Sequence, residues 1–152
     1  MKRIILLFTI AATMILTIAC GSAAPIMTPT PSSPQMTASV NGTEVDVTLG
    51  DNTIKSSQTT FKVGVPYTFV ILNTGRHAHN FNIAPPVSVA GSLDAALSSA
   101  LLSVSRDQLQ IGEGAQVEYT FLDSAVGQQL EFSCLIPKHY EDGMLLTITV
   151  TK

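Results

Sequence analysis

Short apolar runs alternate with turn-forming residues from Val40 to the end of the chain. Most of these runs have the two-residue period of a β-strand. The alternating runs are residues 45–49, 80–83, 116–121 and 130–134, and the run 144–150 is rich in strand-forming residues. The run Tyr67–Leu72 is apolar throughout, which is typical of a strand covered on both faces. This pattern predicts an all-β fold, a β-sandwich of short strands.

One segment departs from the strand pattern. Residues 92–103, SLDAALSSALLS, are rich in Ala and Leu and place apolar residues at helical spacing after a possible Ser92 cap. We expect a short helix here, inserted between strands and packed on one edge of the sandwich. It carries no recognisable chemistry.

The first residues have the features of an export signal. Lys2 and Arg3 precede an uncharged run, Ile4–Ala19, which is short for a transmembrane helix. Residues 1–19 are therefore predicted to be a signal peptide. The sequence Thr17–Cys20 resembles the lipobox of bacterial lipoproteins, although leucine is usual at the position of Thr17. Lipidation of Cys20 is the favoured interpretation, and cleavage after Ala24 or an uncleaved anchor are the alternatives.

Residues 20–39 connect this signal to the predicted domain. They hold four of the eight prolines and several Ser and Thr residues, with no apolar periodicity. Such a composition predicts a semi-extended tether. The expected organisation is thus a signal peptide, a lipidated tether and a domain over residues 40–152. We expect it to lie outside the cytoplasm, anchored by its lipid to the outer face of the cytoplasmic membrane.

Composition excludes one class of partner. The formal net charge is −3, and no run of Lys or Arg is present that could follow a phosphate backbone. A nucleic-acid partner is not expected.

The segment Cys134–Met144, CLIPKHYEDGM, brings a thiol, an imidazole and a thioether into one short stretch. Strand parity places Cys134 on the core-facing side of its strand, and does the same for Met144 and His79 at the ends of theirs. His139 lies on the connecting loop. This set suits a copper ion, whereas singly a buried cysteine or a core histidine would be ordinary. If Cys20 carries lipid, Cys134 is the remaining thiol of an exported chain, and a bound metal would protect it.

Two segments resemble the cupredoxin family of plastocyanin, azurin and auracyanin. Residues 73–81, NTGRHAHNF, look like the first ligand segment, and residues 129–150 look like the C-terminal Cys, His, Met loop and last strand. The resemblance covers residues 40–152 and implies a Greek-key β-sandwich or barrel with one type 1 copper ion. It implies His79, Cys134 and His139 as equatorial ligands and Met144 as the weak axial ligand.

The resemblance also implies a supporting role for Asn80, whose backbone N–H would point at the Cys134 sulfur and tune the reduction potential of the copper site. Two positions depart from the family pattern. Leu135 stands where many relatives have Ser or Thr bonded to the Asn side chain, and Leu146 stands where relatives often have Gly. Neither position is a ligand.

The favoured function is a mononuclear blue copper electron carrier, expected to act as a monomer without a small-molecule substrate. It would exchange electrons with membrane-bound or soluble redox proteins. His139 would be the exit, because Leu135, Ile136 and Pro137 form an apolar patch on its loop. His77 is expected to be a surface residue, and the alternatives are a residue that supports the ligands or an alternative ligand. Tyr140, Glu141 and Asp142 are expected to form a solvated turn.

Copper delivery or storage by the same ligands is the alternative function. Enzymatic activity is not expected, because three histidines in the whole chain cannot furnish the additional centres of multicopper oxidases or nitrite reductases. The binuclear centre of cytochrome oxidase needs two cysteines in the loop, and this loop has one.

Overall fold

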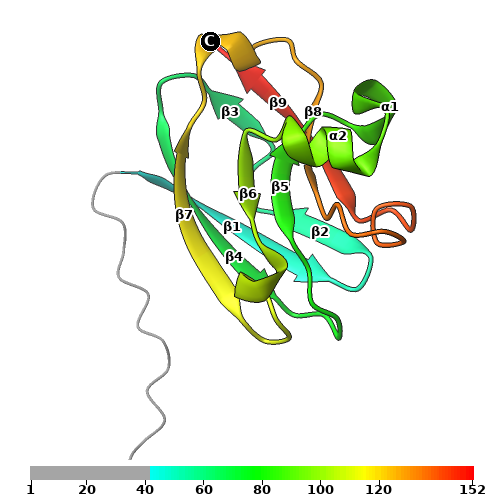
Figure 1. Cartoon of the computed structure of the whole chain (residues 1–152). Coiled ribbons are helices and arrows are strands. Elements are labelled where there is room, and N and C mark those ends of the chain that lie inside the picture. The colour runs from blue at the N-terminus through cyan, green and yellow to red at the C-terminus, as the bar shows by residue number, and fades with distance from the viewer. Residues whose placement is uncertain (1–41) are drawn as a thin grey trace, which may run out of the picture. The chain divides into compact units, whose positions relative to one another are not determined.

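The computed structural model describes residues 42–152, which form two β-sheets with a small helical insertion (Figure 1). Within this range the strands are β1 (Thr43–Gly50), β2 (Thr53–Ser56), β3 (Thr60–Lys62), β4 (Pro66–Asn73), β5 (Phe81–Ala84), β6 (Leu102–Val104), β7 (Gly114–Thr120), β8 (Leu130–Ser133) and β9 (Leu145–Thr151). The helices are α1 (Val87–Ala90) and α2 (Leu93–Ser98), with two 3₁₀ turns, η1 (Arg106–Gln108) and η2 (Asp123–Ala125). The all-β fold class is confirmed.

The two sheets mix parallel and antiparallel neighbours. One has the order β2-β1-β4-β7, and the other has the order β3-β9-β8-β5-β6. β1 runs parallel to β4, with Leu49 opposite Asn73, whereas β8 is antiparallel to both β5 and β9. This order brings the ends of β5, β8 and β9 together, and those ends carry the predicted ligands.

A cluster of aromatic rings fills the space between the sheets. Five phenylalanines are fully buried: Phe61, Phe69, Phe81, Phe121 and Phe132. Phe61 is central, since its ring centroid lies 5.1 Å from that of Phe121 and 5.7 Å from that of Phe132. Aromatic pairs at these separations stabilise a core beyond their buried area alone. The rigid framework behind the ligand-bearing strand ends is built from these rings.

The strands predicted from hydrophobic patterning are present with shifts of one to two residues at their ends. Residues 67–71 are buried on both faces, whereas Leu72 is 46% exposed. The pattern did not reveal β2, β3 and β6, which are only three or four residues long. A run this short gives too few alternations to distinguish a strand from a loop.

The helix predicted over residues 92–103 is too long. Ser92 does cap α2, because its side chain accepts a hydrogen bond from the Ala95 N–H at 3.1 Å. The helix nevertheless ends at Ser98, and Leu102–Val104 become a strand that pairs with β5. Pairing with the neighbouring strand outweighs the helical spacing of the Leu and Ala residues.

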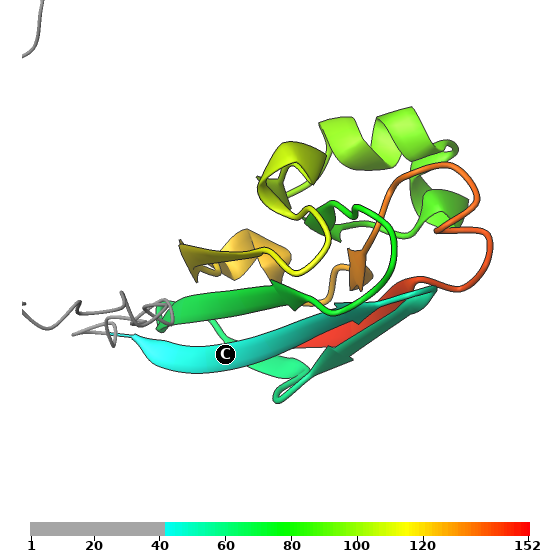
Figure 2. The same ribbon diagram turned by 90° about the horizontal axis from the view of Figure 1, so that it is seen from below.

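The helical insertion covers one side of the domain. In Figure 2, α1 and α2 lie on the side opposite to the cyan strand β1. Their apolar side chains pack with Ala84 of β5 and with Leu135, in a small cluster separate from the main core. The insertion is thereby attached to the segment that follows Cys134.

The predicted signal peptide, Cys20 and the tether lie outside the described residues, so these assignments stay predictions. Among residues 42–152, no helix has the length and apolar character needed to cross a membrane.

Candidate metal centre

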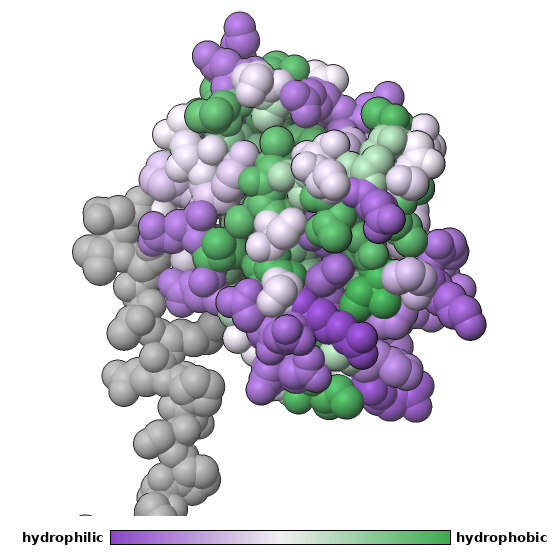
Figure 3. Space-filling model, in the orientation of Figure 1, coloured by the Kyte–Doolittle hydropathy of each residue, from purple (hydrophilic) through white to green (hydrophobic). Residues whose placement is uncertain are grey.

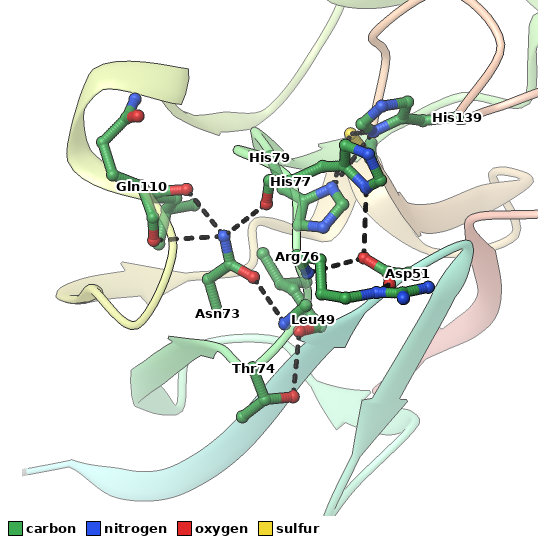
Figure 4. Close-up of polar contacts among 12 residues, drawn as sticks. Leu49, Asp51, Asn73, Thr74, Arg76, His77, His79, Gln110 and His139 are labelled. Carbon is green, nitrogen blue, oxygen red and sulfur yellow. Dashed lines mark hydrogen bonds and ion pairs between the residues drawn. The ribbon is translucent and has the colours of Figure 1, made fainter.

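His79 lies on the loop between β4 and β5, and Asn73 organises that loop. The buried Asn73 amide donates to the carbonyl oxygens of His77 at 2.8 Å and Leu109 at 2.9 Å, and its oxygen accepts from the Gly75 N–H at 2.9 Å (Figure 4). The His79 N–H donates to Leu109 O at 3.1 Å. These bonds therefore tie the loop that carries His79 to the neighbouring segment at Leu109.

The loop from Cys134 to Met144 is closed by its own backbone. Cys134 N–H donates to Met144 O at 3.1 Å, and Met144 N–H donates to His139 O at 3.0 Å. Gly143, with φ of 94°, supplies the left-handed turn just before Met144. Three predicted ligands lie on this loop: Cys134, His139 and Met144. These bonds hold them together in one small hairpin-like turn.

Three of the predicted ligands converge on a single point. The Nδ1 atoms of His79 and His139 are 3.1 Å apart. The Cys134 sulfur lies 3.9 Å from the His79 Nδ1 and 3.6 Å from the His139 Nδ1. These atoms form the only metal-capable cluster of His, Cys, Asp or Glu side chains among the described residues.

The spacing of these three donor atoms fits a metal ion. Bonds of about 2.0 Å to nitrogen and about 2.3 Å to sulfur, as zinc makes with the same atoms, would place trigonal donors roughly 3.5–3.8 Å apart. The observed separations of 3.1, 3.6 and 3.9 Å bracket that range. Thiolate and imidazole donors together suit copper.

Met144 completes the predicted set. Its side chain is fully buried and belongs to the main core together with Cys134. Its backbone is bonded to both Cys134 and His139, as described above, which fixes its position beside the convergent donors.

The protein environment favours neutral His79. Burial lowers the pKa of His79, and the neighbouring His139 lowers it further. A neutral imidazole keeps a lone pair for a metal. The Nε2 atom of His79 is buried and has no hydrogen-bond partner in residues 42–152, so packing holds this ring in place.

Burial raises the pKa of the Cys134 thiol, whereas hydrogen bonds from the backbone N–H groups of Ile136 and Asn80 lower it. Burial has the larger effect, so the pKa of the thiol is raised overall. The two backbone N–H groups favour the thiolate, which is the form that binds metal, and the tuning role implied for Asn80 stays a prediction.

The Asn80 side chain joins the two ligand segments despite the Leu at position 135. Its Oδ1 accepts from the Leu135 backbone N–H at 2.8 Å and from the Asn82 side chain at 3.0 Å. The backbone N–H of Leu135 therefore supplies this bond without a side-chain hydroxyl at position 135.

Two expectations for the loop need correction. Leu135 is only 5% exposed, since it packs against Ala84 and Ala96 under the helices, so it is not part of the surface patch. Tyr140 is not in a solvated turn, because its hydroxyl accepts from the Val87 N–H at 3.0 Å and its ring packs with the same cluster. Glu141 and Asp142 are exposed as expected.

Asp51 is a contributor that the sequence did not reveal. It follows β1 in a Gly-Asp-Asn stretch that indicates only a turn, yet its carboxylate accepts from the Arg76 backbone N–H at 2.7 Å and from Arg76 Nε at 2.8 Å. His77 Nδ1 lies 3.3 Å from the same carboxylate. His77 is exposed, as predicted. No local pattern could have linked Asp51 to residues 25 positions away.

Comparisons with known proteins agree with the site. Residues 43–151 match the family model of copper binding proteins of the plastocyanin/azurin family. The copper-resistant cuproprotein CopI of Pseudomonas aeruginosa is 28% identical over 138 residues, which cover 70% of this chain and 75% of CopI.

Solved auracyanins share the fold. Dithionite-reduced auracyanin from the photosynthetic bacterium Roseiflexus castenholzii has a TM-score of 0.51 at 21% identity, covering 74% of this chain and 99% of that protein. Auracyanin B has a TM-score of 0.57 at 20% identity, covering 76% and 94% respectively. The match of the family model across both ligand segments, with convergent imidazole and thiol donors, shows that the chain belongs to the plastocyanin/azurin family of copper-binding proteins, the cupredoxins.

Proposed function

We propose that the chain is a mononuclear type 1 copper electron-transfer protein. His79, Cys134 and His139 would be the equatorial ligands, with Met144 as the weak axial one. The observation that carries the proposal is the convergence of two Nδ1 atoms and one sulfur within 3.9 Å of each other at a buried point. When bound there, copper supplies a one-electron couple between Cu(I) and Cu(II).

The chain's own residues keep this site from rearranging. His79 is 1% exposed and Cys134 and Met144 are fully buried, so water is excluded from three of the four positions. The Asn80 side chain joins the two ligand segments, and the Asn73 amide holds the His79 loop against Leu109. A site that changes little between oxidation states favours fast electron transfer.

His139 is the proposed exit for the electron. It is the partly exposed member of the set, and Ile136 and Pro137 flank it on the same loop with partial or full exposure. A redox protein docking on this loop would approach the buried donors through one imidazole ring. The partner is proposed to be a redox protein of the membrane or of its surroundings.

The test uses the full chain purified in mild detergent. Addition of Cu(II) should produce an intense thiolate-to-copper absorption band that reductant bleaches reversibly. Cys134→Ser should bind Cu(II) without that band, because the sulfur that gives the transition is absent. A wild-type protein that stays colourless with one bound copper would overturn the proposal.

Copper handling is the second candidate, favoured by one observation, the similarity to a copper-resistant cuproprotein. Dissociation distinguishes the two functions. An electron carrier should retain Cu(I) for hours in the presence of a Cu(I) chelator, because its ligands are buried. A delivery protein should lose the ion to the chelator within minutes.

We propose no substrate chemistry for the isolated chain. The single cluster of metal-capable side chains in residues 42–152 would be filled by its own ligands and leaves no second centre to bind oxygen or nitrite. Turnover of either substrate by copper-loaded protein would contradict this.

We also propose that Cys20 is lipidated and holds the domain at the outer face of the cytoplasmic membrane. The support is the sequence Thr17–Cys20 after a short apolar run. Full-length protein should fractionate with membranes, whereas Cys20→Ala should appear in the soluble extracytoplasmic fraction or remain as uncleaved precursor. Soluble wild-type protein would overturn the anchor.

A further inference from the structure

His77 lies beside the metal centre without belonging to it. Its side chain is 66% exposed, and its ring centroid is 6.1 Å from that of His139. The rings of His139 and His79, which are proposed to share one ion, have centroids 5.0 Å apart. The three imidazoles therefore form a series from the surface to the buried site, and Figure 4 shows His77 between Asp51 and His139.

Asp51 fixes the tautomer of His77. The His77 Nδ1 lies 3.3 Å from Asp51 Oδ1, and Arg76 holds the other carboxylate oxygen at 2.8 Å. Hydrogen bonds from Arg76 keep the pKa of Asp51 well below its usual range, so Asp51 is a carboxylate that only accepts. The proton of neutral His77 must then sit on Nδ1, which leaves the Nε2 lone pair free. A carboxylate that orients a histidine in this way is typical of metal-binding histidines.

The buried ligands need such an outer group. His79 is 1% exposed, and Cys134 and Met144 are fully buried, so an ion from solvent cannot meet them first. Of the four proposed ligands only His139 reaches the surface in part. An ion held by His77 would already lie next to the imidazole ring of His139.

We propose that His77, oriented by Asp51, is a capture site for copper ions that loads the buried centre through His139. The proposal rests on the proposed function, since it requires that copper finally binds His79, Cys134 and His139. No bond other than metal–ligand bonds changes in this step, and the oxidation state of the ion stays the same. The Arg76 charge beside the site is paired with Asp51. Two further cations lie near the centre, Lys138 on the His139 loop and Arg106, whose charge acts on Cys134.

The experiment measures how fast metal-free protein becomes loaded. Metal-free full chain in detergent is mixed with Cu(II) in a stopped-flow instrument, and the growth of the thiolate-to-copper band is followed at several copper concentrations. The variants are His77→Gln and, as the matched control, Arg76→Gln. Arg76 is on the same loop and contacts the same carboxylate, but its side chain offers no lone pair to a metal.

We expect His77→Gln to load about tenfold more slowly, the lower bound for loss of a group that supports metal binding. Its final spectrum and reduction potential should equal those of the wild type, because no ligand is changed. Arg76→Gln should load at least as fast as the wild type, since the negative charge of Asp51 is then no longer neutralised by a paired cation.

The outcomes separate this inference from the proposed function. Equal loading rates for wild type and His77→Gln would overturn the capture site and leave the blue centre intact. An equal slowing in both variants would also overturn it, because the loop and not the imidazole would be responsible. Failure of the wild type to develop the band would overturn the proposed function itself.

Discussion

Gly75 packs so closely on His79 that a β-carbon at position 75 would lie 2.9 Å from Nε2 of the imidazole ring. The same β-carbon would lie 2.8 Å from the Asp51 carboxylate and 3.1 Å from the Asp51 backbone nitrogen. Because His79 Nε2 has no hydrogen-bond partner in residues 42–152, this contact is what orients the ring from behind. Glycine is thus required at position 75 because there is no room for a side chain, although the backbone conformation there is an ordinary one.

Gly75→Ala should move the His79 ring and weaken the metal centre. Overpacking at a site with backbone on one side costs about 1–3 kcal/mol of stability. We expect a lower copper affinity and a shifted absorption band, measured by chelator competition and visible spectroscopy.

Gly42→Ala is the control for Gly75→Ala. A β-carbon at Gly42 would meet Thr68 Oγ1 at 2.9 Å, a similar overlap just before β1, at the end of that strand remote from Leu49 and the ligand loop. It should lower the unfolding temperature and leave the spectrum unchanged. If both variants keep a wild-type spectrum, the Gly75 contact does not orient His79.

Asn80→Ala should destabilise the domain and alter the site. The Leu135 N–H would lose its acceptor at a buried position, which costs about 1–3 kcal/mol. Asn80→Asp keeps an oxygen acceptor and adds a negative charge beside the proposed ligands. We expect Asn80→Asp to retain more stability than Asn80→Ala but to lower the reduction potential, because a negative charge favours the more positive oxidised ion. Denaturant unfolding and voltammetry measure the two effects, and equal stabilities of the two variants would contradict the bracing role.

Glu131 makes stability depend on pH. It is 3% exposed, and burial raises its pKa above the ordinary value of 4.5 even though Tyr140 donates a hydrogen bond to it. The folded protein therefore binds this proton more tightly than the unfolded chain. The resulting stability is fully present below pH 4.5 and is lost as the pH rises through the raised pKa.

Glu131→Gln removes this titration and keeps an acceptor for Tyr140. Metal-free Glu131→Gln should resist urea better than the wild type at neutral pH, with the difference shrinking as the pH falls toward 4.5. The exposed Glu44→Gln is the control and should follow the wild type at every pH. A constant difference between Glu131→Gln and the wild type across this range would rule out the buried carboxylate as the cause.

Strand periodicity predicts most of the fold. It also predicts that His79, Cys134 and Met144 point inward, because these residues lie at the ends of alternating strands. Phe81 and Phe132, whose ring centroids lie 5.1 Å apart, show the same parity in the core. What periodicity misses depends on contacts between distant segments. Leu102–Val104 become a strand only because β5 lies alongside, and Leu135 turns inward only because α2 covers it. Asp51 resembles a simple turn residue until the fold brings Arg76 and His77 against it.

The surface around His139 provides the last prediction. Ile136 is partly exposed on the proposed exit loop. Figure 3 shows that hydrophilic residues gather toward the lower end of the face it displays, with hydrophobic residues across its middle. Ile136→Lys replaces an apolar contact of this loop with a charge that must be desolvated when two copies meet there. We expect Ile136→Lys to slow electron self-exchange between oxidised and reduced copies by about tenfold or more, because burying an unpaired charge in the contact is costly.

Self-exchange needs no knowledge of the natural partner, and NMR line broadening in mixtures of the two oxidation states measures its rate. The control is Leu122→Lys, which adds the same charge to a residue that is 66% exposed just before η2. It should leave the rate near that of the wild type, and both variants should keep the wild-type spectrum. Because Leu135 is buried, the loop offers Ile136 and Pro137 as its apolar contacts, and an unchanged rate in Ile136→Lys would show that electrons leave the protein by another face.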